Sequence, residues 1–267
     1  MLELYTHPLS PCAQKVRIVL AEKQLAYKAH YVDLPKKENL KPEYLKLNPL
    51  GVVPTLVHDK MPVIESSIIC EYLDDAFPEH ALKPKSALAR SEMRMWMKHV
   101  DGKLHPSCGA LQWPLVMRPK LMEKTPEERL ALLQKIPEKP RRERQQRLVD
   151  MGLHAPDIAA AVKVYVQTIE QMEAALQKQR WLVSDEFSLA DIVVAPYFQT
   201  VHQFGWYEML TDAPHVKDWF HRCQQRQSYQ MGVSSDFTAE LLADLHSKGQ
   251  EGWQVIRQHM GAANESY

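Results

Sequence analysis

Residues 48–67 read Asn-Pro-Leu-Gly-Val-Val-Pro-Thr-Leu-Val-His-Asp-Lys-Met-Pro-Val-Ile-Glu-Ser-Ser. The aliphatic and β-branched residues around Pro54 favour a strand, but proline has no N–H to donate to a strand ladder. Pro54 therefore marks a strand start, and a cis bond between Val53 and Pro54 fits that position. The backbone N–H and C=O of Val53 would then face outward, ready to hold an extended peptide.

The second half of the stretch predicts a hairpin and then a helix. Residues 58–60 are typical of a turn, residues 63–64 of the returning strand, and residues 65–67 of the start of a helix over residues 68–77. The first N–H groups of a helix and its dipole favour a carboxylate. A peptide clamp beside a carboxylate socket suits the tripeptide glutathione.

A strand, a helix and a second strand are predicted before this stretch. Residues 2–6 form a short apolar strand, and Ser10-Pro11 supplies an N-cap and a first-turn proline for a helix that runs to about Lys23. Residues 29–32 favour a strand, and residues 36–47 a polar, irregular helix. The order strand, helix, strand implies a parallel pair with a right-handed crossover.

Nearly everything after residue 88 has the pattern of a helix. Residues 89–104 carry apolar side chains at helical spacing, and Pro106 should bend or end that helix. A proline-rich and charged stretch up to Pro156 indicates an elaborated helical hairpin. Ser188 can cap the N–H of Asp191 while the Asp191 carboxylate reaches back, which is a capping box with Asp in place of Glu. Its expected role is folding rather than chemistry.

Taken together, the proline loop, the Glu-Ser pair and the Ser-Leu-Ala-Asp box resemble the cytosolic glutathione transferases. The resemblance spans both halves of the chain and implies the glutathione transferase fold. That fold has an α/β thioredoxin-like N-terminal domain followed by an all-α C-terminal domain. The expected parts are a glutathione-binding domain at residues 1–78, a linker at 79–88 and a helical second-substrate domain at 89–267.

The resemblance also implies which residues bind glutathione. Lys41 would meet the glycyl carboxylate, with Lys37 as the alternative lysine. The others are Val53 and Pro54 for the cysteinyl backbone and Glu65 and Ser66 for the γ-glutamyl end. One position departs from the family, which often has Gln or Lys two residues before the proline. Val52 stands there, so one side-chain contact to the peptide is expected to be missing.

The catalytic candidate is Ser10. A free thiol has a pKa near ~8.5, so glutathione needs a hydrogen-bond donor that stabilises its thiolate. A hydroxyl at the start of a helix supplies both the hydrogen bond and the dipole, and His-Pro-Leu-Ser-Pro resembles the motif of the serine-type members. Ser10 could also be a simple N-cap, and both roles can hold at once. Tyr5, inside a strand, is better explained as structural.

Cys12 offers a rival chemistry. Cysteine-type relatives form mixed disulfides with glutathione, but their cysteine occupies the place that Ser10 takes here. Cys12 falls in the first helical turn, where a packed cysteine is more common than a nucleophile. A thiol–disulfide reductase that uses Cys12 therefore stays open as an alternative. A non-catalytic binding protein with the same fold is the other one.

The second substrate is expected against the first long helix of the helical domain. An aromatic electrophile would suit its mixed aromatic and polar groups, which are Trp96, His99, Lys103 and Trp113. Asp101, His105 and Cys108 have spacings of four and three residues and could be metal ligands. No fourth partner is in view, so the pattern favours a plain helix face and no metal.

Composition bounds the function further. The 33 basic and 33 acidic residues cancel, so nothing indicates nucleic acid. No apolar run approaches membrane-spanning length, no signal peptide is evident, and the four cysteines are too widely spaced for a disulfide framework. We expect a cytoplasmic protein that forms a homodimer and binds no membrane.

Within the family, residues 64–73 and 90–96 look like those of the bacterial β-aryl etherases, which cleave lignin-derived ethers. The long hairpin before Pro156 fits the same subgroup. The sequence therefore predicts a glutathione transferase in which a thiolate held by Ser10 attacks an electrophilic carbon, with β-aryl ethers as the candidate substrates.

Overall fold

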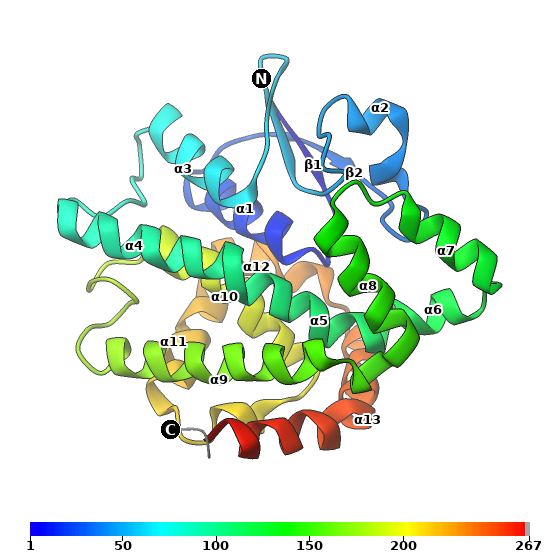
Figure 1. The fold of residues 1–267 in the computed structure, drawn as a ribbon. Coiled ribbons are helices and arrows are strands. Elements are labelled where there is room, and N and C mark those ends of the chain that lie inside the picture. Colours follow the sequence, from blue (N-terminus) through cyan, green and yellow to red (C-terminus); the bar gives the residue numbers. More distant parts are fainter. Residues whose placement is uncertain (265–267) are drawn as a thin grey trace. The chain divides into compact units, whose positions relative to one another are not determined.

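Figure 1 shows the computed structural model of the chain, which describes residues 1–264 and side chains as far as residue 261. Residues 265–267, the last three of the predicted helical domain, lie outside the described residues. The chain divides into two compact units. The first unit consists of residues 1–100, 175–196 and 217–237, and the second of residues 101–174, 197–216 and the chain from residue 238 onward.

The first unit contains a four-stranded sheet with the order β2-β1-β3-β4. Its strands are β1 (Leu2–Thr6), β2 (Lys28–Tyr31), β3 (Thr55–His58) and β4 (Met61–Val63). β1 runs parallel to β2 and antiparallel to β3, which pairs antiparallel with β4. The predicted thioredoxin-like order is confirmed. β4 begins at Met61, two residues before the prediction, and its Pro62 is tolerated because β4 is an edge strand.

Four helices belong to the first part of this unit. They are α1 (Pro11–Glu22), α2 (Pro42–Leu45), α3 (Ser66–Ala76) and α4 (Ala87–His99), with a 3₁₀ turn at Glu38–Leu40. α1 packs against α3 and against α12 (Gln227–Gly232). Lys23, at the end of α1, and Asp74 of α3 form a buried ion pair of 2.8 Å, and Asp74 also accepts from the N–H of Leu82.

The second unit is built from helices. A π-helical turn, Val100–Leu104, precedes α5 (His105–Val116), which has Pro106 in its first turn, so the predicted break before Pro106 is present. The predicted hairpin consists of α6 (Arg118–Met122), α7 (Pro126–Gln134) and α8 (Lys139–Met151). It is held by a buried cluster of Leu121, Leu133, Ile136 and Val149. The other long helices of this unit are α9 (Pro156–Leu176), apart from its last two residues, and α13 (Ala239–Asn264). Two more helices are shared between the units: residues 189–196 of α10 (Leu189–Gln203) and residues 217–225 of α11 (Pro214–Gln225) belong to the first unit.

The start of α10 corrects one detail of the predicted capping box. The Asp191 carboxylate accepts a hydrogen bond from the Ser188 N–H at 3.1 Å, as expected, but the Ser188 hydroxyl accepts from the N–H of Ala190. The backbone carbonyl of Ser188 already accepts from the N–H of Asp191. Asp191 also accepts from the N–H of Leu182 at 3.0 Å and from the indole of Trp219 at 2.8 Å. Burial raises its pKa to about 6.

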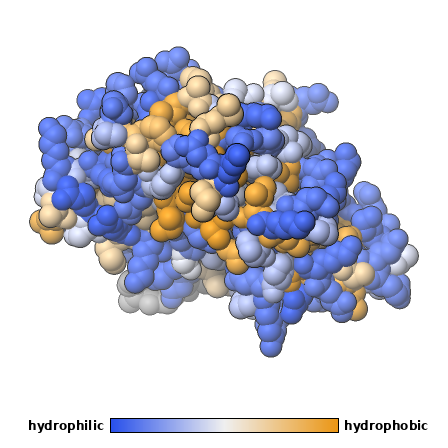
Figure 2. Space-filling model, turned by 90° about the horizontal axis from the view of Figure 1, so that it is seen from above, coloured by the Kyte–Doolittle hydropathy of each residue, from blue (hydrophilic) through white to orange (hydrophobic). Residues whose placement is uncertain are grey.

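The surface of the chain is mixed in polarity. On the face that Figure 2 shows, apolar atoms (orange) gather among a larger number of hydrophilic ones (blue). Several large apolar side chains of the first unit are exposed, among them Met61, Ile68, Leu88 and Met95. No helix within residues 1–264 is both long and apolar enough to cross a membrane.

Candidate functional site

The sheet brings three predicted segments to one of its ends. Tyr5 pairs with Thr55, so the end of β1, which leads to Ser10, lies beside the start of β3, which follows Pro54. Leu56 pairs with Val63, so β4 leaves the sheet at the same end and leads to Glu65 and Ser66. Because the strands are antiparallel, segments far apart in the sequence meet here.

Ser10 caps the first helix of the chain. Its backbone is extended (φ −86°, ψ 113°), and its Oγ accepts a long hydrogen bond of 3.4 Å from the N–H of Ala13. The capping role is therefore confirmed. In this contact the hydroxyl uses a lone pair, so its O–H proton stays available for a further acceptor. An anionic sulfur at the start of α1 would be such an acceptor, and the helix dipole would favour its charge.

The loop before Ser10 is held by side chains of α1 itself. Gln14 Nε2 and Arg17 Nη2 both donate to the carbonyl oxygen of Pro8 at 2.9 Å. The ring of His7 accepts from the N–H of Leu9, and burial lowers the pKa of His7, so this ring is neutral at neutral pH. Ser10 is thus held by the contacts to Pro8 and Leu9 before it and by its capping contact with Ala13 after it.

The proline loop has the predicted cis bond between Val53 and Pro54. A buried polar network holds it. The carbonyl of Val52 accepts from the Tyr44 hydroxyl at 2.6 Å and from Asn48 Nδ2 at 3.0 Å, and both groups also bond to Thr55 Oγ1. Burial raises the pKa of Tyr44 to about 12, so its hydroxyl stays protonated.

The start of α3 has two features that favour an anion, namely an uncapped first turn and no acidic residue within it. Glu65, the residue before the helix, is exposed and has φ 70°, a left-handed value that costs a non-glycine residue about 1–3 kcal/mol. Its side chain does not cap the helix, and the first turn carries no acidic residue. The buried Ser66 follows directly. Strain of this kind is often kept at ligand sites because it places a side chain for binding.

Lys41, predicted for the glycyl carboxylate, lies between the 3₁₀ turn and α2. Its Nζ is 3.0 Å from a carboxylate oxygen of Glu38, and more than half of its side chain is exposed. The hydrogen bond from the N–H of Asp33 and the one from Lys41 lower the pKa of Glu38. The alternative, Lys37, has a left-handed backbone with φ 59°. The role of either lysine stays a prediction.

The four predicted second-substrate residues belong to different units. Trp96 and His99 are half-buried on α4 in the first unit, with ring centroids 6.1 Å apart in an edge-to-face contact. In the second unit, Lys103 is exposed in the π-helical turn, and Trp113 packs against the hairpin cluster of Leu121, Leu133, Ile136 and Val149. Whether they bind a substrate stays a prediction.

The cysteines differ in their surroundings. Cys12 is half-buried in the first turn of α1, whereas Cys70, Cys108 and Cys223 are buried. The sulfur of Cys108 bonds to Gln112 at 2.7 Å and to Thr200 at 3.3 Å. Among the residues that the structure describes, no three His, Cys, Asp or Glu side chains are grouped so as to hold a metal ion.

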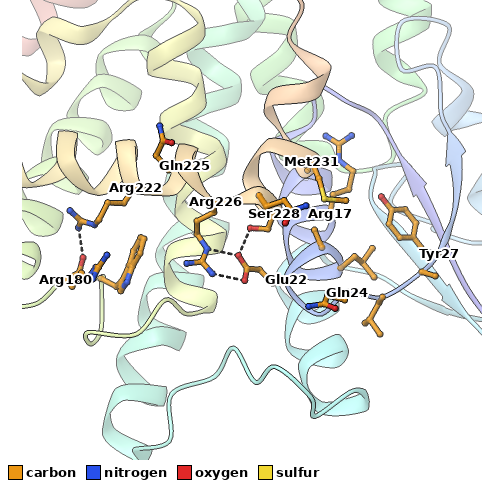
Figure 3. Close-up of a pocket in the computed structure, with 17 residues that line it drawn as sticks. Arg17, Glu22, Gln24, Tyr27, Arg180, Arg222, Gln225, Arg226, Ser228 and Met231 are labelled. Carbon is orange, nitrogen blue, oxygen red and sulfur yellow. Dashed lines mark hydrogen bonds and ion pairs between the residues drawn. The ribbon is translucent and has the colours of Figure 1, made fainter.

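A groove of about 1020 Å³ lies elsewhere in the first unit, along α1 and α12 (Figure 3). Its carboxylate, Glu22, is bonded to Arg226 at 2.7 and 2.8 Å and accepts from Ser228. Burial alone would raise the pKa of Glu22, but these hydrogen bonds hold it below its usual value. None of the predicted site residues is among those that line the groove. The ion pair ties α12 to α1, and we assign the groove no part in the glutathione site.

Sequence reasoning missed the residues that hold the site in place, namely Gln14, Lys15, Arg17, Tyr44 and Asn48. Four of them are polar side chains that the fold buries almost completely, and Tyr44 is buried as well. Lysine and arginine on a helix normally indicate a solvent-facing side. The one available signal was Asn48, since Asn next to proline often holds a turn.

Comparisons with known proteins agree with this geometry. Residues 9–76 match the family described as "Glutathione S-transferase, N-terminal domain", and residues 155–227 match "Glutathione S-transferase, C-terminal domain". Protein LigF of Sphingobium sp. (strain NBRC 103272 / SYK-6) is 29% identical over 253 residues, which cover 92% of this chain and 98% of LigF. Glutathione S-transferase 3 of Zea mays is 29% identical over 240 residues, covering 88% and 94%.

Solved structures of glutathione S-transferases and of a β-etherase are also similar to this chain. The crystal structure of β-etherase LigF superposes with a TM-score of 0.79 at 28% identity, covering 88% of this chain and 99% of that one. A theta class glutathione S-transferase from Xanthomonas axonopodis pv. citri, crystallised with glutathione bound, has a TM-score of 0.64 at 25% identity and covers 87% and 96%.

Proposed function

Because this chain belongs to the glutathione S-transferase superfamily, we propose that it binds glutathione at residues Ser10, Lys41, Val53, Pro54, Glu65 and Ser66 and joins the glutathione sulfur to an aromatic electrophile. The finer part of the proposal is that this electrophile is a β-aryl ether. Support for it comes from the likeness to the β-etherase LigF of Sphingobium sp..

One observation carries the proposal. The Ser10 hydroxyl caps α1 through a lone pair and keeps its proton, at the end of the sheet where the proline loop and the start of α3 also lie. A hydroxyl donor, a peptide-binding backbone and a carboxylate socket are the three things that glutathione needs. Each comes from a segment at the same end of the sheet.

The reaction follows from that arrangement. Ser10 donates a hydrogen bond to the glutathione thiolate, which lowers the pKa of the thiol and keeps the sulfur ionised near neutral pH. In a β-aryl ether with a neighbouring carbonyl, the carbon next to the carbonyl is electrophilic. The sulfur attacks this carbon, the C–S bond forms as the C–O bond breaks, and the phenolate leaves with the bonding electrons and takes up a proton. The products are a glutathione thioether and a phenol.

The test compares two electrophiles with the purified protein and glutathione. One is a β-aryl ether ketone and the other is a chloro-nitrobenzene, and mass spectrometry follows the glutathione adduct and the released phenol. Ether cleavage with stoichiometric adduct supports the proposal in full. Turnover of the aryl halide alone leaves a general glutathione transferase and removes the ether from the proposal.

A second candidate function rests on Cys12. It is the half-buried cysteine of the four and lies in the first turn of α1, where the helix dipole favours a thiolate. In a thiol–disulfide reductase the Cys12 thiolate would attack a glutathione-containing disulfide, keep the glutathionyl group as a mixed disulfide and release the other thiol. The thiolate of a second glutathione would then attack the mixed disulfide, which frees Cys12 and gives glutathione disulfide. Loss of activity in Cys12→Ser, with Ser10→Ala unaffected, would favour this function.

We also propose that the chain forms a homodimer. The exposed apolar side chains Ile68 on α3 and Leu88 and Met95 on α4 supply apolar surface that a second copy could cover. Sedimentation of the purified protein measures the oligomeric state directly. The cytoplasmic location stays a prediction.

A further inference from the structure

A lysine lies buried behind the start of α3. Lys15, on α1, is fully buried, and its Nζ is 3.3 Å from the Oγ of Ser66 and 3.5 Å from the Oγ of Ser67. These serines are the first two residues of α3 and are also buried. A charged ammonium group therefore stands directly behind the residue that the proposed function assigns to the γ-glutamyl end of glutathione.

The ammonium group determines what the Ser66 hydroxyl can do. An ammonium only donates hydrogen bonds, so the oxygen of Ser66 must accept in this contact. The O–H proton of Ser66 then points to another partner, which must be an acceptor. A carboxylate accepts and never donates when ionised, whereas an amide or an amine presents N–H groups as well. Lys15 thus makes Ser66 a donor that favours a carboxylate.

The surroundings of α3 add to this preference. No acidic residue stands in the first turn of α3, and the side chain of Glu65 before it makes no capping hydrogen bond, so the N-cap side chain accepts from none of the first N–H groups of the helix. Lys15 adds a full charge in a buried place, where charges are screened only weakly. The exposed Glu65 beside it can bind the amino group of the same γ-glutamyl unit.

From these contacts we infer that Lys15 is a positioning residue that makes the site selective for the free α-carboxylate of the γ-glutamyl group. It acts through Ser66 and touches neither the sulfur nor the electrophile. The inference rests on the proposed function. It adds that the charge of Lys15 takes part in recognising the γ-glutamyl end of the tripeptide. The expected ligands of this site are therefore γ-glutamyl peptides with an ionised α-carboxylate.

The experiment uses two ligands and the change Lys15→Met. One ligand is glutathione, and the other is glutathione whose γ-glutamyl α-carboxylate is replaced by a carboxamide. Because a hydrogen bond to a charged group contributes more binding free energy than one between neutral groups, Lys15→Met should weaken glutathione binding by about 10- to 100-fold. Binding of the carboxamide, measured by calorimetry, should change by less than about threefold. Lys15→Arg, which keeps the charge, should restore part of the affinity for glutathione alone.

Steady-state kinetics give a second readout that a purely structural role would not produce. Because Lys15 acts on binding, the loss should fall on the KM for glutathione rather than on kcat at saturation. An equal loss for both ligands in Lys15→Met, or no rescue by Lys15→Arg, would overturn the inference.

A further arm needs no change of Lys15, in case Lys15→Met does not fold. Ser66→Ala in the native background should weaken glutathione binding much more than carboxamide binding, because only the carboxylate is a pure acceptor for the Ser66 proton. Equal weakening would refute the role of Ser66 as a directed donor and, with it, the inference. A native protein that does not bind glutathione at all would instead refute the proposed function, so the two failures are distinct.

Discussion

The hydroxyl of Tyr44 lies 2.6 Å from the carbonyl oxygen of Val52 and donates a hydrogen bond to it, while Asn48 donates to the same oxygen. Val52 is the residue at which the family often has a Gln or Lys side chain. In this structure the backbone carbonyl of Val52 is held by the buried side chains of Tyr44 and Asn48, so the proline loop is fixed from the interior of the unit. The geometry of Val53 therefore depends on a residue of α2.

Tyr44→Phe should loosen that loop. Removing the hydroxyl leaves the Val52 carbonyl with the Asn48 amide as its remaining partner, so the loss should be about 0.5–1.5 kcal/mol of unfolding free energy. Glutathione affinity should fall several-fold, because Val53 would no longer be held in place. Urea unfolding and calorimetric titration measure the two effects.

The matched control is Tyr72→Phe. The Tyr72 hydroxyl bonds to His58 Nδ1 at 2.7 Å in the same unit, away from the proline loop. This change should affect stability and leave glutathione affinity near its native value. Equal losses of affinity in both variants would show that the loop network has no special role.

Local features of the site were predictable because neighbouring residues determine them. The Ser10-Pro11 pair starts α1, and the proline loop has its cis bond, and both depend on residues adjacent in the chain. Lys15 was not predictable, since its partners lie 51 and 52 residues away and nothing local indicates that a lysine on this helix is buried.

The second-substrate residues illustrate another limit. Aromatic residues on a helix, such as Trp96 and Trp113, can line a pocket, but the same pattern describes residues that pack in a core. In the structure Trp113 contacts the hairpin cluster in the second unit. The four buried residues of that cluster come from α6 to α8 and the turns between them, so their contact depends on the tertiary fold and has no periodic signal in one helix.

The proposed thiolate role of Ser10 predicts a clear difference between two substitutions. Ser10→Ala removes a hydrogen bond to a charged sulfur and should lower kcat/KM about 10- to 100-fold. It should also raise the pKa of bound glutathione, read from thiolate absorbance against pH. Cys12→Ala, one residue from the same helix start, should change both values little. The reverse pattern would assign the chemistry to Cys12.

Glutathione binding can be measured through thermal stability, without an electrophile and without any reaction. Glutathione stabilises the folded state by mass action, so the native protein should show a rise in Tm that grows with glutathione concentration. Glu65→Ala and Ser66→Ala should each remove most of this rise, since both residues belong to the proposed site for the γ-glutamyl end. Glu71→Ala, on the same helix and paired with Arg94 at 2.8 Å, is the control and should keep it. An unchanged rise in both site variants would place glutathione elsewhere.

Asp191 predicts a pH dependence of stability. Burial raises its pKa from 3.8 to about 6, so between these values the folded protein binds more protons than the unfolded chain. The contribution of this group is therefore full below about pH 3.8 and is lost as the pH rises through about 6. At about 1.36 kcal/mol per pKa unit, the loss should be up to about 3 kcal/mol.

Asp191→Asn isolates that contribution. The stability difference between the native protein and Asp191→Asn should be larger at pH 4 than at pH 7, when urea unfolding is measured at both. Losing the carboxylate also weakens the bonds to Leu182, Ser188 and Trp219, so the variant should be less stable throughout. Glutathione affinity of the folded fraction should stay near native. A difference that does not vary with pH would refute the raised pKa.

The role of His99 can be tested through the leaving group. If His99 protonates the departing oxygen of a β-aryl ether, its removal matters most when the phenolate is a poor leaving group. General acid help of this kind is typically worth about 10²–10⁴ in rate. His99→Ala should therefore slow release of an unsubstituted phenol by a factor in that range and release of a nitrophenol far less.

Lys98→Ala, an exposed neighbour on α4, is the control and should slow neither. An equal loss for both ethers in His99→Ala would mean that His99 positions the substrate beside Trp96 and transfers no proton. If His99→Ala had no effect on either ether, Lys103→Met in the same pair of assays would decide whether that lysine assists the leaving oxygen instead.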